Sequence, residues 1–338
     1  MLSRYEKANY GVRAPWLKAA VTGLSAIGCR GERRLSILIF HRVTDQVDPL
    51  FPEEIHGQRF ASLMETLASN FNVLGLPEAI DRTVRHDLPP RAVCITFDDG
   101  YADNLDVAAP ILKRWDLPAT VFVASGFLDG GLMWNDEAIE CLRNCRWSQL
   151  DLAWLGLGSL PLDSVVSRRH AIDRVLGVLK YRSPFDRRQA LDRLVAESGV
   201  TPRRDLMLTN SQLRLLLDLG IEIGGHTRDH PILAVLSEHE ARRQIGEDRE
   251  YLQSLMGEAP RYFAYPNGGP GTDYLSVHVD MVKKAGYAGA VSTAWGSFSS
   301  RGDLYQIPRF TPWDRGPAAF ALRLAHNAWR RDELVCNG

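Results

Sequence analysis

Short apolar runs alternate with stretches of helical spacing along most of the chain. The runs are rich in β-branched and aromatic residues and predict strands, whereas apolar positions repeating every three or four residues predict amphipathic helices. The predicted strands are 35–40, 92–97, 120–124, 221–225, 261–265, 287–292 and 307–310. Such alternation indicates an α/β fold with a parallel sheet that is closed, or nearly closed, into a barrel.

One long region breaks this alternation. Residues 127–210 show helical spacing and no clear strand, which predicts a helical insertion after the third strand. We expect it beside the catalytic face, as a lid or as one wall of a substrate groove. The remaining chain divides into an N-terminal helical extension (1–34), a barrel (35–320) and a C-terminal helix or tail (321–338).

Composition narrows the partners of the chain. Its 338 residues carry a net charge of −1, so the chain lacks the excess of positive charge that would predict nucleic-acid binding. The five cysteines are odd in number and are expected to be reduced. No stretch is long enough to span a bilayer.

The N-terminal region leaves the compartment open. Residues 16–28 precede Cys29 as in a lipoprotein signal, but Lys18 interrupts the apolar run, and an amphipathic helix is the preferred interpretation. A cytoplasmic or membrane-peripheral location is favoured, and peripheral membrane contact stays open.

Chemically active residues follow four of the predicted strands. His41, the pair Asp98-Asp99, His226 and Pro266 each come directly after an apolar run. In α/β barrels the active site lies at these carboxyl ends of the strands. The aspartate pair alone is also typical of a turn with a helix cap, and histidines spaced like His226 and His230 also occur on ordinary helices.

Together, these residues predict a metal site. Two adjacent carboxylates repel each other, and one pKa rises unless a cation intervenes. One aspartate with His226 and His230 would make an open, three-ligand zinc site, and the other aspartate would stay free as a base.

Four segments resemble the polysaccharide deacetylases, carbohydrate esterase family four, also called the NodB-homology group. They are ILIFHRV (37–43), TFDDG (96–100), HTRDHP (226–231) and FAYPNG (263–268). The resemblance runs from about residue 35 to 312, apart from the insertion. It implies a distorted (β/α) barrel of about seven parallel strands that removes N- or O-linked acetyl groups from sugars.

The same resemblance implies roles for individual residues. Asp99, His226 and His230 would bind Zn²⁺ or another divalent transition metal, and Asp98 would be the general base. The expected activity is metal-dependent removal of acetyl groups from an N-acetylated sugar in a polysaccharide or glycan precursor. A backbone N–H, that of Asn267, would stabilise the oxyanion.

The chain departs from the family pattern at two places. The segment FAYPNG has Ala264 where the family often has an arginine, and Arg309 or Arg261 could supply that charge. We prefer Arg309, which lies at a strand end. The family also often has a leucine-x-histidine motif near the end of the barrel, whose histidine protonates the leaving group. This motif is absent here, so His41 is our candidate for the general acid, and the alternative is that His41 is a structural core histidine.

Substrate contacts are predicted at Pro266, Asn267 and three aromatic residues near strand ends, Tyr101, Trp134 and Trp313. Aromatic rings stack on the apolar faces of pyranoses, although core packing would also explain each ring. Two other function classes stay open at this point. One is a catalytically degenerate carbohydrate-binding barrel, and the other is a metal-dependent phosphoesterase.

Overall fold

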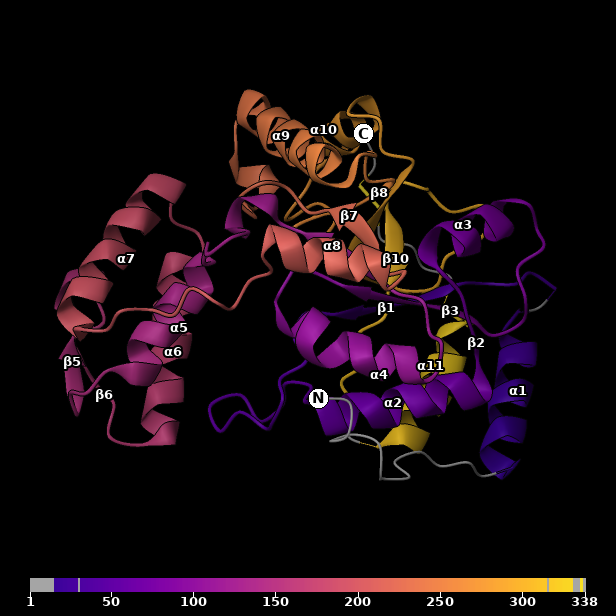
Figure 1. The fold of residues 1–338 in the computed structure, drawn as a ribbon, viewed down its shortest axis with the longest axis horizontal. Helices are drawn as coiled ribbons and strands as arrows, with labels where there is room; N and C mark the ends of the chain where they lie inside the picture. Colours follow the sequence, from indigo (N-terminus) through magenta and orange to yellow (C-terminus); the bar gives the residue numbers. More distant parts are fainter. Residues whose placement is uncertain (1–14, 30, 315, 331–334, 337–338) are drawn as a thin grey trace. The chain divides into compact units, whose positions relative to one another are not determined.

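The computed structural model describes residues 15–29, 31–314, 316–330 and 335–336 and divides into two compact units (Figure 1). The first unit consists of the chain up to residue 46, residues 55–128 and the chain from residue 208 onward. The second unit consists of residues 47–54 and 129–207. It therefore contains most of the predicted insertion, together with a short segment that nothing in the sequence pattern assigned to it.

The first unit is built on a parallel sheet. Its seven main strands follow the order β1-β3-β4-β7-β8-β9-β10, and β2 pairs with β3 beside this path. The strands are β1 (Ser36–Phe40), β2 (Asn72–Val73), β3 (Ala92–Phe97), β4 (Thr120–Val123), β7 (Glu222–Gly225), β8 (Tyr262–Ala264), β9 (Gly289–Trp295) and β10 (Ile307–Arg309). All seven predicted strands are present, which confirms the α/β barrel, and within this sheet only the two-residue β2 was not predicted.

The two ends of this sheet meet, so that it closes into a nearly complete barrel. Leu38 of β1 forms a parallel bridge with Phe310, directly after β10. The Ile39 N–H donates to the Phe310 carbonyl at 3.1 Å, and the Phe310 N–H donates to the Ile37 carbonyl at 2.7 Å. The first strand therefore neighbours the last, and the side chains that follow both strands come to the same rim.

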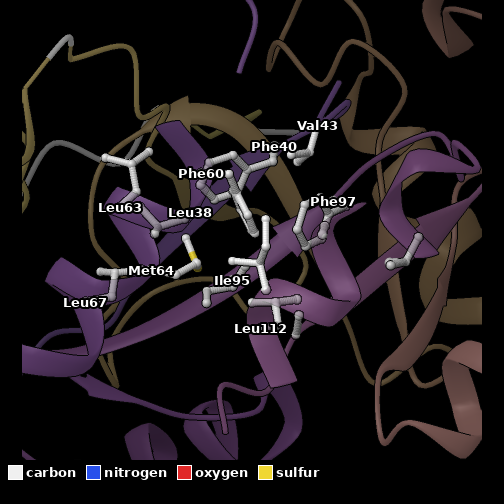
Figure 2. Packing of buried hydrophobic residues seen from close by; sticks show 14 of the residues in the cluster. Leu38, Phe40, Val43, Phe60, Leu63, Met64, Leu67, Ile95, Phe97 and Leu112 are labelled. Atoms are coloured by element: carbon white, nitrogen blue, oxygen red, sulfur yellow. The ribbon is translucent and has the colours of Figure 1, made fainter. Parts of the chain in front are cut away.

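Alternate residues of the strands serve two hydrophobic clusters, because successive side chains point to opposite faces of a sheet. Ile37 and Cys94 belong to a cluster that draws on strands all around the barrel. Phe40 and Phe97, three residues further along the same strands, point to the other face. They belong to the cluster that packs against the covering helices, where the Phe60 ring contacts both of their rings (Figure 2). This burial on both sides explains why the strands read as continuous apolar runs.

Eight helices of the described residues belong to the first unit. They are α1 (Pro15–Cys29), α2 (Gly57–Asn70), α3 (Leu76–Val84), α4 (Ala109–Arg114), α8 (Asn210–Asp218), α9 (Glu238–Met256), α10 (Ser276–Lys284) and α11 (Pro317–Asn327). A π-helical turn, Asn104–Ala108, leads into α4. The N-terminal helix α1 packs through Leu17 and Val21 into the same cluster as α2 and α11.

The second unit has its own apolar core and its own elements. These are α5 (Trp134–Asn144), β5 (Gln149–Asp151), β6 (Ser159–Pro161), α6 (Val165–Leu179) and α7 (Pro184–Ser198). The antiparallel β5–β6 pair differs from the expectation of a purely helical insertion. Cys141 and Cys145 are buried in this core and form no disulfide, as expected for reduced thiols. Among the described residues no helix combines the length and the apolarity needed to cross a bilayer.

Candidate active site

The ends of four barrel strands place the predicted residues at one rim. The Asp98 N–H still donates to the Phe40 carbonyl at 2.9 Å, so β1 and β3 stay paired up to this point. Asp98 continues the inward-facing series that contains Cys94 and Thr96. At Asp99 the backbone turns into the left-handed region, with φ of 77°, and this carboxylate takes a different direction.

Asp99 faces the two predicted histidines. Its Oδ1 lies 3.3 Å from Nε2 of His226 and 3.3 Å from Nε2 of His230. One ligand atom from each of the three residues lies within 4.8 Å of the others, and this is the one such cluster among the described residues. Thr227 and His230 also have positive φ angles, of 64° and 50°, so the loop after β7 holds a strained backbone.

The chemistry of these three side chains fits a divalent metal ion. Asp99 Oδ1 is buried and accepts no well-formed hydrogen bond within the described part of the chain, which is costly for a carboxylate oxygen. Burial and the neighbouring His226 lower the pKa of His230 to about 4 in spite of Asp99, so its imidazole is neutral at pH 7. A carboxylate and imidazole nitrogens are the ligand types of catalytic zinc sites.

His226 is fixed from two sides. Its ring Nδ1 lies 2.7 Å from the Ala264 carbonyl oxygen, which turns Nε2 toward Asp99. Burial opposes a charge on this ring, but the nearby carboxylates of Asp99 and Asp98, together with the Ala264 carbonyl, leave the pKa of His226 raised. A proton and a metal ion would therefore compete for the same nitrogen.

The main chain of His226 is held by Asp248, a fully buried residue of α9. Asp248 Oδ2 accepts the His226 N–H at 3.0 Å, and Oδ1 accepts the Ser125 N–H at 3.1 Å. This one carboxyl group thereby joins the ends of β4 and β7. A Cβ at Gly225 would lie 2.8 Å from Asp248 Oδ2 and would also meet the Tyr287 hydroxyl, so the approach requires glycine.

Asp98 is paired with Arg309. The guanidinium donates from Nη1 to Oδ1 at 2.7 Å and from Nη2 to Oδ2 at 2.6 Å, and its Nε donates to the Ser292 carbonyl at 2.9 Å. The side chain of Arg309 is completely buried. Burial favours the neutral acid, but the Arg309 charge outweighs it, and the pKa of Asp98 lies below its usual value.

The rival candidate, Arg261, lies at the opposite end of the barrel strands. Arg261 lies directly before β8, and its Nη2 is 3.3 Å from Oδ1 of Asp81 on the surface. The preference for Arg309 over Arg261 therefore agrees with the geometry.

His41 and Asn267 also stand at the rim. The exposed His41 follows β1, and the Asn104 amide donates to its carbonyl at 2.9 Å. Burial raises the pKa of Asp99, but the neighbouring His230, His226 and His41 together leave it lowered. The exposed Asn267 has φ of 57°, and its N–H donates to no acceptor among the described residues.

The turn that carries Asn267 is restricted at its next residue. Gly268 has φ of 71°, and a Cβ there would lie 2.9 Å from the Thr293 backbone nitrogen. A side chain at this position would push the turn away from β9.

Sequence comparison assigns the chain to a family. The sequence model named Polysaccharide deacetylase matches residues 85–149 and 187–290, together half of the chain. The chain belongs to the polysaccharide deacetylase family. The matched segments contain Asp98, Asp99, His226 and His230, whereas His41 and Arg309 lie outside them.

Similar proteins of this family cover most of the chain at low identity. YxkH of Bacillus subtilis (strain 168), assigned to the polysaccharide deacetylases, is 20% identical over 278 residues, 82% of this chain and 70% of its own length. The Streptococcus pyogenes deacetylase PplD in complex with acetate has a TM-score of 0.57 at 18% identity over 87% of this chain and 99% of its own. IcaB from Ammonifex degensii has a TM-score of 0.56 at 19% identity, over 86% and 97%. At such identities the structures support the deacetylase fold alone.

The three predicted aromatic contacts differ in their surroundings. Tyr101 is only 3% exposed, and the Arg42 guanidinium lies 5.0 Å from the centroid of its ring, so its contact with a sugar stays a prediction. Trp134 belongs to the second unit, where Arg187 lies over its ring. Trp313 is exposed and contacts Trp295 edge to face, with 5.3 Å between ring centroids. Pro266 is buried beneath the turn that carries Asn267.

Sequence reasoning missed Asp248 and Asn104. A signal for Asp248 was present, because it shares the buried stripe of α9 with Ala241, Ile245 and Leu252. A carboxylate at helical spacing within an apolar stripe indicates a buried hydrogen-bond acceptor. Asn104 opens the π-helical turn, a feature that has no sequence signature.

Proposed function

We propose that this chain is a metal-dependent deacetylase that hydrolyses the N-acetyl group of an amino sugar in a polysaccharide or glycan precursor. The observation that carries the proposal is the different surroundings of two adjacent carboxylates. Asp99 faces two imidazoles, whereas Asp98 is held by a buried guanidinium. Neighbouring groups with such different partners have separate roles, one as ligand and one as base.

Asp99, His226 and His230 would hold the metal ion. When bound, it would lower the pKa of a water molecule and polarise the acetyl carbonyl. His226 is oriented for this task by the Ala264 carbonyl and by Asp248, in the way that outer hydrogen bonds orient metal-binding imidazoles.

Asp98 would take the proton of the attacking water. Arg309 keeps it ionised, and a carboxylate that accepts two N–H groups still has free lone pairs for a water hydrogen. The free N–H of Asn267 would donate to the carbonyl oxygen as it gains negative charge. His41, exposed at the same rim, would protonate the sugar nitrogen as the C–N bond breaks.

The choice of an N-acetyl substrate rests on a relative and on the donor set. A de-N-acetylase from Aggregatibacter actinomycetemcomitans has a TM-score of 0.55 over 84% of this chain, at 18% identity. An amide needs a proton on its leaving nitrogen, and His41 supplies a group for that step. A catalytically degenerate barrel would have lost its general acid and its arginine, and the pairing of Arg309 with Asp98 argues against the second loss.

An acetate-release screen tests the proposal. The 338-residue chain is loaded with zinc and incubated with N-acetylglucosamine oligomers, peptidoglycan fragments and exopolysaccharide precursors, with and without chelator. We expect acetate from at least one substrate, its loss with chelator and its recovery with added zinc. Asp98→Asn is the control for contaminating activity. Protein that holds zinc and frees no acetate from any of these glycans would favour a carbohydrate-binding role.

A further inference from the structure

The N-terminal helix α1 has apolar side chains in the core and also on its exposed face. Leu17 and Val21 face the core of the first unit and are fully buried. About 120° around the helix from them, Trp16 is 57% exposed, Ile27 is 63% exposed and Gly23 between them is also exposed. At 3.6 residues per turn these three positions fall within about 20° of one line along the helix. An apolar line on the outward side of a helix marks a contact surface.

Positive charge and an indole ring border the exposed face of α1. The segment 15–29 has no acidic residue, and its one charged side chain is the exposed Lys18, about 160° around the helix from Trp16 and thus at the other edge of this face. On the same edge as Lys18, the guanidinium of Arg91 donates to the Thr22 hydroxyl. On the other flank, the indole of Trp329 donates to the Leu24 carbonyl at 2.8 Å.

None of the bordering cations is neutralised within the described part of the chain. Lys18 and Arg91 form no ion pair there, whereas the guanidinium of Arg330, which follows Trp329, lies 4.0 Å from the centroid of the Trp295 ring. The surface therefore combines an apolar line, two partly exposed indoles and two positive charges. This combination is complementary to a bilayer that contains anionic lipid, since indoles favour the interface and cations favour the headgroups.

The size of the surface argues against a protein partner. A 15-residue helix is about 22 Å long and about 10 Å wide, so its outward side covers roughly 220 Å². A stable protein–protein interface needs about 800 Å² from each partner. A single helix of this kind, lying flat, suits insertion into the headgroup region.

We propose that the outward side of α1, together with Trp329, docks flat onto a bilayer surface that contains anionic phospholipid. Trp16 and Ile27 would enter the boundary between headgroups and acyl chains. Lys18 and Arg91 would contact the lipid phosphates. This interaction is independent of the reaction proposed for the barrel, so its test succeeds or fails whatever the substrate.

Vesicle co-sedimentation of the 338-residue chain tests the proposal. Vesicles of phosphatidylcholine alone are compared with vesicles that also contain phosphatidylglycerol. We expect binding to the mixed vesicles that weakens with salt, and a partition coefficient at least about tenfold lower for the double variant Trp16→Ser, Ile27→Ser. Lys18→Glu should weaken binding to the mixed vesicles about fivefold or more and leave neutral vesicles unaffected.

A matched double variant controls for general loss of surface apolarity. Trp147→Ser with Leu215→Ser removes a tryptophan that is 58% exposed and a helical leucine that is 51% exposed, both outside α1, and should bind as the unaltered chain does. Circular dichroism confirms that each variant is folded. The proposal is overturned if the unaltered chain ignores anionic vesicles, or if both double variants behave alike. It is equally overturned if sedimentation shows a dimer that the Trp16, Ile27 variant dissociates.

Discussion

Replacing Arg309 with methionine removes the guanidinium that holds Asp98 and leaves a side chain of similar length. In the folded chain this arginine is fully buried and contacts both carboxylate oxygens of Asp98. Without Arg309, burial still favours the neutral acid of Asp98, and the main group that favours the carboxylate is gone. We therefore expect the pKa of Asp98 to rise from below its usual value to above it.

The size of the pKa shift of Asp98 follows from the loss of the opposite charge and from the burial that remains. A hydrogen-bonded opposite charge lowers the pKa of a carboxyl by about 1–3 units, and burial without such a partner raises it further. A shift of about 2 units or more is expected, and each unit corresponds to about 1.4 kcal/mol. Breaking a buried ion pair also destabilises a fold by about 3–5 kcal/mol.

The change in stability has a defined pH window. The pKa of Asp98 is lower in the folded chain than in the unfolded chain, where it is about 3.9. The ion pair therefore contributes fully to stability above about pH 3.9, and this contribution is lost as the pH falls through the folded pKa. At neutral pH the contribution is fully present, so Arg309→Met should unfold at lower urea concentration there. Arg309→Lys keeps the charge without the two-pronged contact and should show an intermediate effect.

The assay is the pH dependence of kcat/KM for acetate release by zinc-loaded enzyme, because its acid limb reports the base of the free enzyme. We expect that limb to move about 2 units toward neutral pH in Arg309→Met. Arg261→Met is the matched control, since Arg261 also pairs with an aspartate but lies exposed at the far end of the strands. Its pH profile should equal that of the unaltered chain. An unmoved limb in a folded, zinc-loaded Arg309→Met would refute this account of Asp98.

Two further predictions concern His41 and Asp248. His41→Ala should slow release of acetate from an N-acetyl sugar roughly a hundredfold. Hydrolysis of nitrophenyl acetate should stay within about twofold of the unaltered rate, because nitrophenolate departs without a proton. Equal slowing of both reactions would show that His41 is not the general acid. Burial raises the pKa of Asp248 to about 7, so the folded chain binds more protons there than the unfolded chain, and stability should fall as pH rises from about 4 to 7. Asp248→Asn should flatten this fall in urea titrations with chelator present, and parallel curves for both proteins would contradict the assignment.

The barrel and its rim could be read from local pattern. Parallel strands buried on both faces give continuous apolar runs, and the polar residue that ends each run marks the rim. Asp98-Asp99 and His226 were located in this way. The position of Arg309 also followed, because β10 pairs beside β1 only if the barrel closes, as the contact of Leu38 with Phe310 shows.

Features that depend on distant contacts could not be read from the sequence. The stripe of α9 indicates that Asp248 is buried but does not name its partner, because only the packing of α9 brings its carboxyl to the His226 N–H, 22 residues earlier in the chain. Tyr101 follows a strand, as a substrate contact would, and its contact with Arg42 is not visible in the sequence. Residues 47–54 join the second unit through pairs such as Arg143 with Asp48, at 2.6 Å, that no local pattern indicates.

The metal content of two neighbouring variants tests the central claim most directly. After zinc loading and gel filtration, the unaltered chain and Asp98→Asn should each retain about one zinc ion, whereas Asp99→Asn should retain little, because Asp99 alone of the pair faces His226 and His230. Equal retention in both variants, or loss from Asp98→Asn with retention in Asp99→Asn, would contradict the division of roles between the two aspartates.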